Sequence, residues 1–177
     1  MMEYTNKYWK MLMPLIKRSL TKRLGKEETA ELIKKADTVY RDMLNRIDDV
    51  GKDNPMASNI YECLVFLAVW KASDGKITVD GLREITREIM STPILKAAGL
   101  YINANKPTGI KRIGKMMTNS AKWIDEHPQY RAASWDFNFD PGKHSEGFYY
   151  HFTRCPLNTF ARREGYLEVL PVMCEID

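Results

Sequence analysis

The chain has 177 residues, of which 44% are hydrophobic and 28% are charged, and its formal net charge is +4. This length suits one domain, residues 1–177, with a core of useful size, and the composition is that of an ordinary soluble globular protein. Lysines and arginines are interleaved with acidic residues rather than gathered into one basic stripe, so the charge pattern does not favour a nucleic-acid-binding protein.

The cysteines and the apolar runs indicate the cellular compartment of the protein. Cys63, Cys155 and Cys174 are three in number and cannot all pair within one chain. The N-terminal residues lack the charged start and continuous apolar core of a secretion signal. The longest apolar run, 63–70, is too short to cross a bilayer. We therefore expect a cytoplasmic protein with free thiols and no membrane partner.

Helical periods dominate the first part of the chain. Apolar residues recurring at intervals of three and four predict amphipathic helices over 4–24 and 27–50. Pro14, in the middle of the first, predicts that this helix is split or kinked. Residues 56–72 leave almost no polar face, which predicts a central core helix with Cys63 buried inside it. Further helices are expected over 79–91, 93–100 and 109–126.

After Pro128 the period changes from helical to two, which is the period of a strand with one buried face. Residues 133–139 and 148–153 are predicted as the strands of a β-hairpin, joined by the loop 140–147. The expected fold class is α+β: a mostly helical part, 4–126, packed on a small antiparallel sheet that contains this hairpin. The last part of the domain, 131–177, carries the hairpin and a cysteine-bearing turn. The aromatic side chains expected to point inward are Trp135, Phe137, Phe148, Tyr150 and Phe152.

The turn after the second strand brings three reactive side-chain types together. Cys155 is a candidate thiol nucleophile, His151 a candidate acid or base, and Arg154 a fixed cation. Pro156 is a common first residue of a helix. Backbone N–H groups at a helix start favour a thiolate, so Cys155 is the strongest catalytic candidate. The alternative is a buried structural cysteine beside a half-exposed histidine.

Cys174 and Asp177 share one helical face through their spacing of three. They are candidates to meet Cys155, either as a second thiol and a carboxylate around a substrate or as ligands of a metal ion together with His151. The spacings are not diagnostic of a metal, and no cofactor is expected. Tyr150 and Trp135, with Arg154, are the candidate substrate-binding residues.

The second half of the chain resembles the L-2-amino-thiazoline-4-carboxylic acid hydrolase family. The resemblance rests on Thr153-Arg154-Cys155, a short helix, Gly165, the Leu-x-x-Leu-Pro motif at 167–171, and Cys174 shortly before Asp177. Pro14-Leu15-Ile16-Lys17 in the helical half is also similar to that family. Its members usually continue further, so the resemblance implies that this chain is short at its C-terminus and that a second copy is a candidate to complete the sheet.

The resemblance implies a hydrolase that opens a cyclic amidine-type C–N bond, turning 2-amino-thiazoline-4-carboxylate into N-carbamoyl-cysteine. In that reading Cys155 is the nucleophile or its activator, His151 the acid or base, and Arg154 the anchor of the substrate carboxylate. The alternative is a non-catalytic binding module similar to four-vinyl-reductase-type domains, in which the inward aromatic residues line an apolar cavity.

Overall fold

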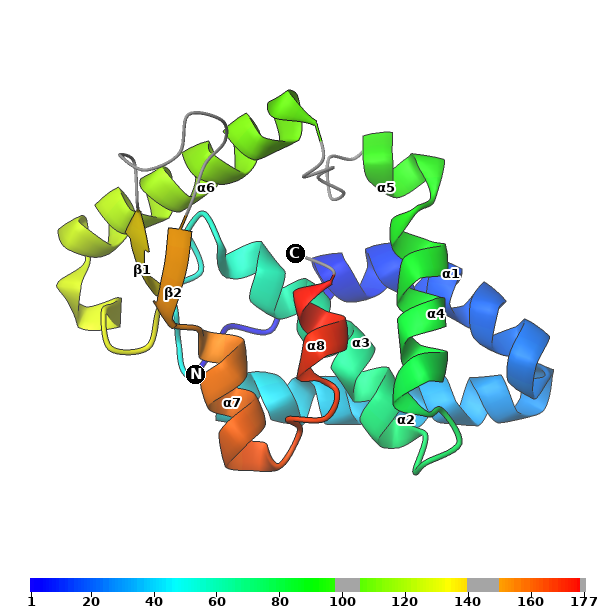
Figure 1. The fold of residues 1–177 in the computed structure, drawn as a ribbon. Helices are drawn as coiled ribbons and strands as arrows, with labels where there is room; N and C mark the ends of the chain where they lie inside the picture. The colour runs from blue at the N-terminus through cyan, green and yellow to red at the C-terminus, as the bar shows by residue number, and fades with distance from the viewer. Residues whose placement is uncertain (98–105, 140–149, 176–177) are drawn as a thin grey trace.

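The computed structural model describes residues 1–97, 106–139 and 150–175, and in this part of the chain helices predominate over one two-stranded antiparallel sheet (Figure 1). The predicted α+β class is therefore confirmed. In chain order the elements are α1 (Asn6–Leu24), α2 (Lys26–Arg46), α3 (Ala57–Ala72), α4 (Val79–Met90), α5 (Pro93–Ala97), α6 (Pro107–Glu126), the 3-10 helix η1 (Pro128–Tyr130), β1 (Asp136–Phe139), β2 (Tyr150–Arg154), α7 (Pro156–Glu164) and α8 (Leu170–Cys174). None of the helices in the described ranges is long and apolar enough to pass through a membrane.

Helix α1 runs without a break through Pro14, so it is not split there. A proline inside a helix removes one backbone hydrogen bond, which destabilises the helix locally. Leu12 and Ile16, on either side of Pro14, are both fully buried in the core. Burial of this apolar face stabilises the helix enough to outweigh the missing bond. The helix ends at Gly25, whose positive φ of 82° suits glycine.

Helix α2 ends at Arg46, four residues before the predicted end at Val50. Ile47 has extended backbone angles, φ −71° and ψ 147°. Ile47 and Val50 are nevertheless both buried. The apolar pattern therefore continues past the helix because an extended segment also packs against the core, and sequence periodicity does not distinguish the two cases.

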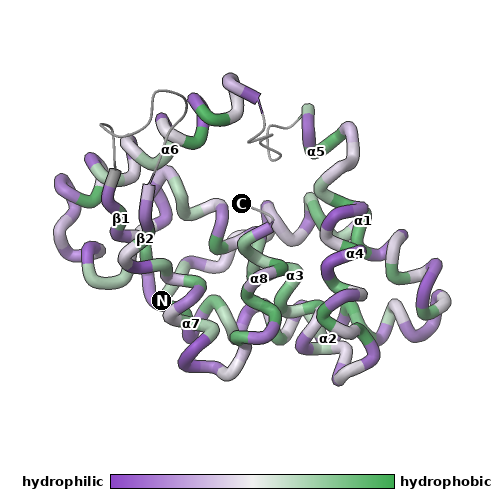
Figure 2. The backbone as a smooth tube through the Cα atoms, in the orientation of Figure 1, coloured by the Kyte–Doolittle hydropathy of each residue, from purple (hydrophilic) through white to green (hydrophobic). Residues whose placement is uncertain are grey.

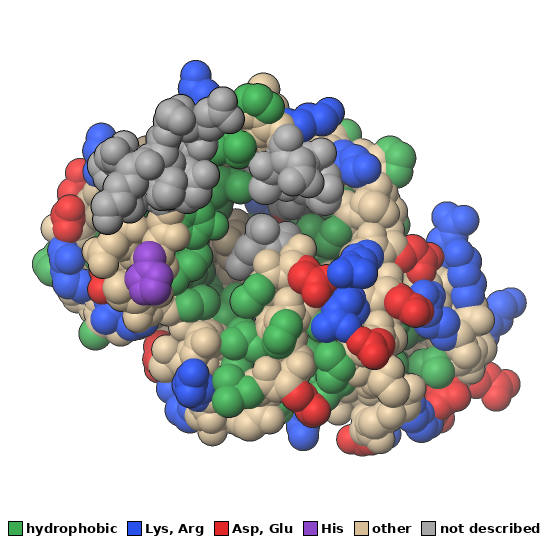
Figure 3. Space-filling view, in the orientation of Figure 1, with side chains coloured by type: hydrophobic (Ala, Val, Ile, Leu, Met, Phe, Trp, Pro, Cys, Tyr) green, Lys and Arg blue, Asp and Glu red, His purple; other side chains and the backbone are tan. Residues whose placement is uncertain are grey.

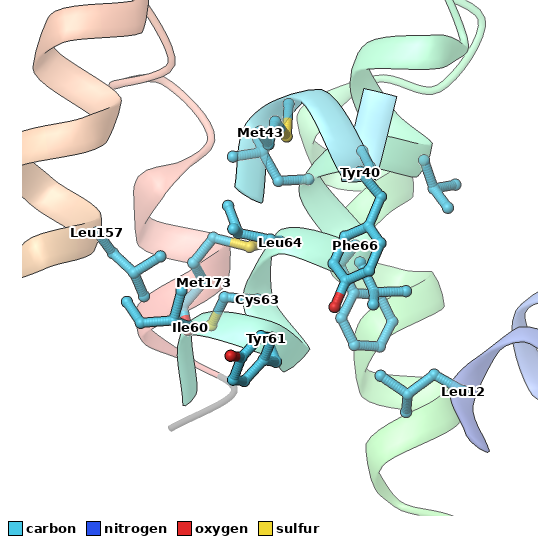
Figure 4. Close-up of a cluster of buried hydrophobic side chains, with 14 of the residues drawn as sticks. Leu12, Tyr40, Met43, Ile60, Tyr61, Cys63, Leu64, Phe66, Leu157 and Met173 are labelled. Atoms are coloured by element: carbon cyan, nitrogen blue, oxygen red, sulfur yellow. Dashed lines mark hydrogen bonds between the residues drawn. The ribbon is translucent and has the colours of Figure 1, made fainter. Parts of the chain in front are cut away.

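Helix α3 is the centre of the core, as predicted, with both α2 and α4 packed against it. Hydrophobic residues predominate where α3, α4 and α8 meet (Figure 2). Cys63 is fully buried there, beside Ile60, Leu157 and Met173 (Figure 4). Its sulfur lies 3.8 Å from the backbone carbonyl oxygen of Met173. The predicted burial of Cys63 is confirmed, and this cysteine links the core helix to α8.

Helix α4 is capped by Thr78. The side chain of Thr78 accepts a hydrogen bond from the backbone N–H of Gly81 at 3.0 Å. One face of α4 contacts α1, where Ser19 donates to Glu88 at 2.8 Å and Arg23 donates at 3.0 Å. These bonds, that of Ser19 first, lower the pKa of Glu88 below its ordinary value. Another face of α4 contacts α8.

The hairpin is present, but its first strand begins later than expected and the described residues of the second strand are less buried than expected. Strand β1 begins at Asp136 because residues 131–134 form a turn in which Tyr130 accepts from the N–H groups of Ala133 and Ser134. Phe137 pairs with Phe152 and Phe139 with Tyr150 across the sheet. Tyr150 is 41% exposed and Phe152 38% exposed. The prediction that these two point inward is therefore wrong, and Phe148 lies outside the described residues.

The exposure has a physical cause. In the described residues the sheet has two strands, and a sheet of this size is too small to bury the side chains on both of its faces. The two aromatic rings instead contact each other edge to face, with centroids 5.2 Å apart, and Phe152 contacts Phe137 at 5.9 Å. The alternating pattern of the sequence correctly predicts the strands. It does not show whether a second layer lies over them.

Candidate functional site

The candidate site is the junction between β2 and α7. Helix α7 begins at Pro156, as predicted, and Cys155 is the residue that caps it with extended angles, φ −129° and ψ 122°. The carbonyl of Cys155 accepts the first hydrogen bond of the helix, from the N–H of Thr159 at 3.0 Å. Cys155 is thus held by a strand on one side and a helix on the other, which fixes its backbone.

Cys155 is the N-cap residue of α7, at the positive end of this helix. Its side chain makes no capping hydrogen bond to the helix, and Cys155 is half-buried against the edge of the core. The unpaired N–H groups of a first helical turn carry partial positive charge, which favours a thiolate over a thiol. Partial burial beside such a helix end is an environment typical of a nucleophilic cysteine.

Arg154 binds the β2–α7 junction to the turn at residues 131–134, which precedes β1. Its Nε donates to the carbonyl of Ser134 at 2.9 Å and its Nη2 donates to the carbonyl of Arg131 at 2.6 Å. Charged donors make stronger bonds to carbonyls than neutral ones. These contacts give Arg154 a structural role, and its predicted role as the carboxylate anchor stays a prediction.

The loop that Arg154 holds is itself anchored by a buried polar network around Asn54. The Asn54 amide nitrogen donates to the Ser134 hydroxyl at 2.9 Å and to the carbonyl of Val50 at 3.1 Å. Its amide oxygen accepts from the hydroxyl of Ser120 at 2.8 Å and from the N–H of Met56 at 3.0 Å. Both amide atoms are therefore satisfied in a buried position, which makes the network a rigid connection.

This network joins three segments that are far apart in the sequence: the loop before α3, helix α6 and the turn before β1. Asn54, Ser120 and Ser134 are 4%, 0% and 0% exposed. Sequence reasoning missed all three, because an asparagine beside Pro55 is typical of a turn and the serines stand in segments with mixed polarity. For Ser120 a signal was present, because it stands at a buried position of the helical period of α6, whereas Asn54 and Ser134 lie outside helices and carry no such signal.

Replacing Arg154 with lysine is expected to lower the free energy of unfolding by about 1–2 kcal/mol, because an ammonium group cannot reach both carbonyls in the planar arrangement of a guanidinium. The measurement is urea unfolding followed by circular dichroism. Arg162→Lys is the matched control, since Arg162 is exposed and donates to Asn158 on its own helix rather than to a distant loop. Equal losses in the two variants would show that the Arg154 contacts do not stabilise the junction.

The other predicted site residues occupy different environments. His151 lies on β2, opposite Asn138, and is exposed. Trp135 is 3% exposed and lies inside the core, next to Ser134 of the polar network. Tyr150 is on the surface of the hairpin. Trp135 is thus buried and Tyr150 is exposed. Their substrate-binding roles stay predictions.

Cys174 is the last residue of α8 and is exposed, whereas Asp177 lies outside the described residues. Helices α7 and α8 contact each other, so Cys155 and Cys174 belong to packed neighbouring helices. Within ranges 1–97, 106–139 and 150–175, no three His, Cys, Asp or Glu side chains are grouped as a metal ion would require. The metal set of Cys155, Cys174 and His151 therefore gains no support from the described residues.

Comparison with known proteins gives one match. A family model described as L-2-amino-thiazoline-4-carboxylic acid hydrolase matches residues 58–177, which is more than half of the chain. The matched range begins in α3 and includes the hairpin, Cys155 and Cys174. Neither the curated proteins nor the solved structures contain a match.

Proposed function

We propose, because this chain belongs to the L-2-amino-thiazoline-4-carboxylic acid hydrolase family, that it hydrolyses 2-amino-thiazoline-4-carboxylate to N-carbamoyl-cysteine. Membership supports the coarser statement that the chain is related to hydrolases of a small molecule. The observation that carries the proposal to particular residues is the half-buried Cys155 at the start of α7, inside the matched range.

The atoms of this reaction identify the bond that breaks. N-carbamoyl-cysteine keeps both nitrogens of the substrate on the ureido carbon and has a new thiol. One water oxygen must therefore add to ring carbon C2, and the bond from C2 to the ring sulfur must break. The C–N bond expected from the sequence is wrong for this product, because cleavage of the ring C–N bond would leave the carbamoyl group on sulfur.

Cys155 can act on C2 in two chemical steps. Its thiolate adds to C2, and the ring sulfur leaves and takes a proton, which opens the ring and leaves the substrate joined to Cys155 through an isothiourea. Water then adds to the same carbon and Cys155 leaves, which gives the ureido product and restores the thiolate. In this proposal His151 supplies and removes the protons, and the anchor of the carboxylate is Arg154.

The test is incubation of folded protein with the thiazoline carboxylate in water enriched in oxygen-18, followed by mass spectrometry. The expected product is N-carbamoyl-cysteine that carries one heavy oxygen in its ureido carbonyl and one new thiol. A parallel sample with a chelator shows whether a metal ion takes part. Absence of product from a sample with intact helical circular dichroism would remove this substrate, and an S-carbamoyl product would contradict the proposed bond cleavage.

A further inference from the structure

Two arginines on α4 hold one carboxylate from the end of the chain. Arg83 and Arg87 stand one helical turn apart, so both side chains lie on one face of α4. Arg83 Nε donates to Oε1 of Glu175 at 3.0 Å, and Arg87 donates to Oε2 from Nε at 3.1 Å and from Nη2 at 2.8 Å. Each carboxylate oxygen thus has its own guanidinium, an arrangement suited to recognising a planar carboxylate.

A cavity of about 250 Å³ opens beside this cluster. Its wall includes the two arginines, Glu175, Thr86, Met90, Ser91 and Val172. Val172 is fully buried behind the cavity, whereas Met90 is 5% exposed and is the apolar side chain that a ligand can reach. Figure 3 shows basic and acidic side chains gathered over the contact between α4 and α8, with hydrophobic side chains beside them. Arg83 also donates to Asp80 at the start of α4. The cavity thus places two paired guanidinium groups beside the side chain of Met90, a combination of polar and apolar groups that small-molecule sites use.

The cluster is separate from the cysteine junction. Helix α8 lies between α7 and α4 (Figure 1) and contacts both of them. The arginines contact the C-terminal end of α8 from the α4 side, whereas Cys155 begins α7 on the other side. One small substrate held at Cys155 therefore does not explain the arginine pair.

The ion pairs of Glu175 are also accessible to exchange. The side chains of Glu175 and Arg87 are 36% and 70% exposed, and that of Arg83 is 26% exposed. Ion pairs in contact with water contribute little net stability, because solvent screens the charges and both side chains lose freedom. A ligand that adds apolar contacts in the cavity to the same two arginine bonds is expected to displace Glu175.

We propose that Arg83 and Arg87 form a binding site for a small-molecule monocarboxylate, and that Glu175 occupies this site as an internal competitor. The ligand's carboxylate takes the place of the Glu175 carboxylate, and its apolar part lies against Met90. This site goes beyond the proposed hydrolysis and does not depend on Cys155. Its occupation breaks the ion pairs that join Glu175 to α4.

The test is calorimetric titration of the whole chain with butyrate, with uncharged butyramide as the matched control ligand. Glu175→Gln is expected to bind butyrate about threefold more tightly than the unchanged chain, because the competing charge is removed. Arg83→Gln and Arg87→Gln are each expected to weaken binding about tenfold. Butyramide is expected to bind none of these proteins measurably.

Glu84→Gln is the matched charge control, since it removes one exposed carboxylate from the same helix and leaves the arginine pair intact. Its affinity for butyrate is expected to equal that of the unchanged chain. The proposal is overturned if Glu175→Gln shows no saturable binding, if it matches Glu84→Gln, or if the arginine variants bind as the unchanged chain does. Circular dichroism shows that each variant is folded. This experiment measures binding and not turnover. A negative result therefore does not contradict the proposed hydrolysis, and absence of hydrolysis does not contradict the proposed carboxylate site.

Discussion

Turnover of 2-amino-thiazoline-4-carboxylate is expected to fall about a thousandfold when Cys155 is replaced with serine, because a hydroxyl at this position is far less ionised and less nucleophilic than a thiolate. The replacement changes one atom and keeps the extended backbone that caps α7. The fold is therefore expected to remain, with unchanged helical circular dichroism. The measurement is kcat and KM for product formation, with KM expected to change much less than kcat.

Cys174→Ser separates the two accessible thiols. Cys174 ends α8 and is exposed, and its helix packs against α7. Near-normal turnover in this variant would assign the chemistry to Cys155 alone, whereas a comparable loss would place both thiols at the reacting carbon. Retention of more than about a tenth of the turnover by Cys155→Ser would exclude nucleophilic catalysis by Cys155.

Gly51→Ala is expected to lower the free energy of unfolding by about 2–5 kcal/mol, through backbone strain and overpacking together. The φ angle of Gly51 is +82°, a value that residues other than glycine rarely adopt. A Cβ added there would lie 2.2 Å from Cη2 and 3.0 Å from Cζ2 of Trp123 on α6. The ring is also stacked on His127, at 4.1 Å between centroids, so moving it aside would disturb that contact.

The matched control is Gly165→Ala. Gly165 also has a positive φ, +78°, but an added Cβ meets nothing within 4 Å. Only the backbone cost of about 1 kcal/mol is expected there. Chemical unfolding of both variants measures the difference. Equal losses would mean that the ring of Trp123 moves aside without cost and that the contact between α6 and the loop at Gly51 does not hold them together.

The helices and the α+β class could be predicted because their signals are local. Apolar residues at intervals of three and four mark α1, α2 and α4, and the stretch 56–72, which has almost no polar face, correctly identifies the core helix. The cap at Thr78 and the helix start at Pro156 depend on single residues with strong local preferences. Each of these features depends on residues within a few positions of the element that it predicts.

The sequence-based predictions were wrong where tertiary packing outweighs the local preference of the residues. Pro14 stays inside α1 because core burial on both sides outweighs a missing hydrogen bond, and α2 ends early because buried Ile47 and Val50 pack equally well from an extended chain. The exposure of Tyr150 and Phe152 depends on whether another layer covers the hairpin, which alternation along one strand cannot reveal.

The family and the candidate nucleophile Cys155 could be recognised from the amino-acid sequence, because the motifs that carry them are short runs of neighbouring residues between 153 and 177. The surroundings of the β2–α7 junction could not be recognised in this way. The carbonyls that bind Arg154, the network of Asn54 with Ser134 and the two arginines on Glu175 join residues 20, 80 and about 90 positions apart. Such contacts form because folding brings donors and acceptors together in space, and no spacing along the chain records which partners will meet.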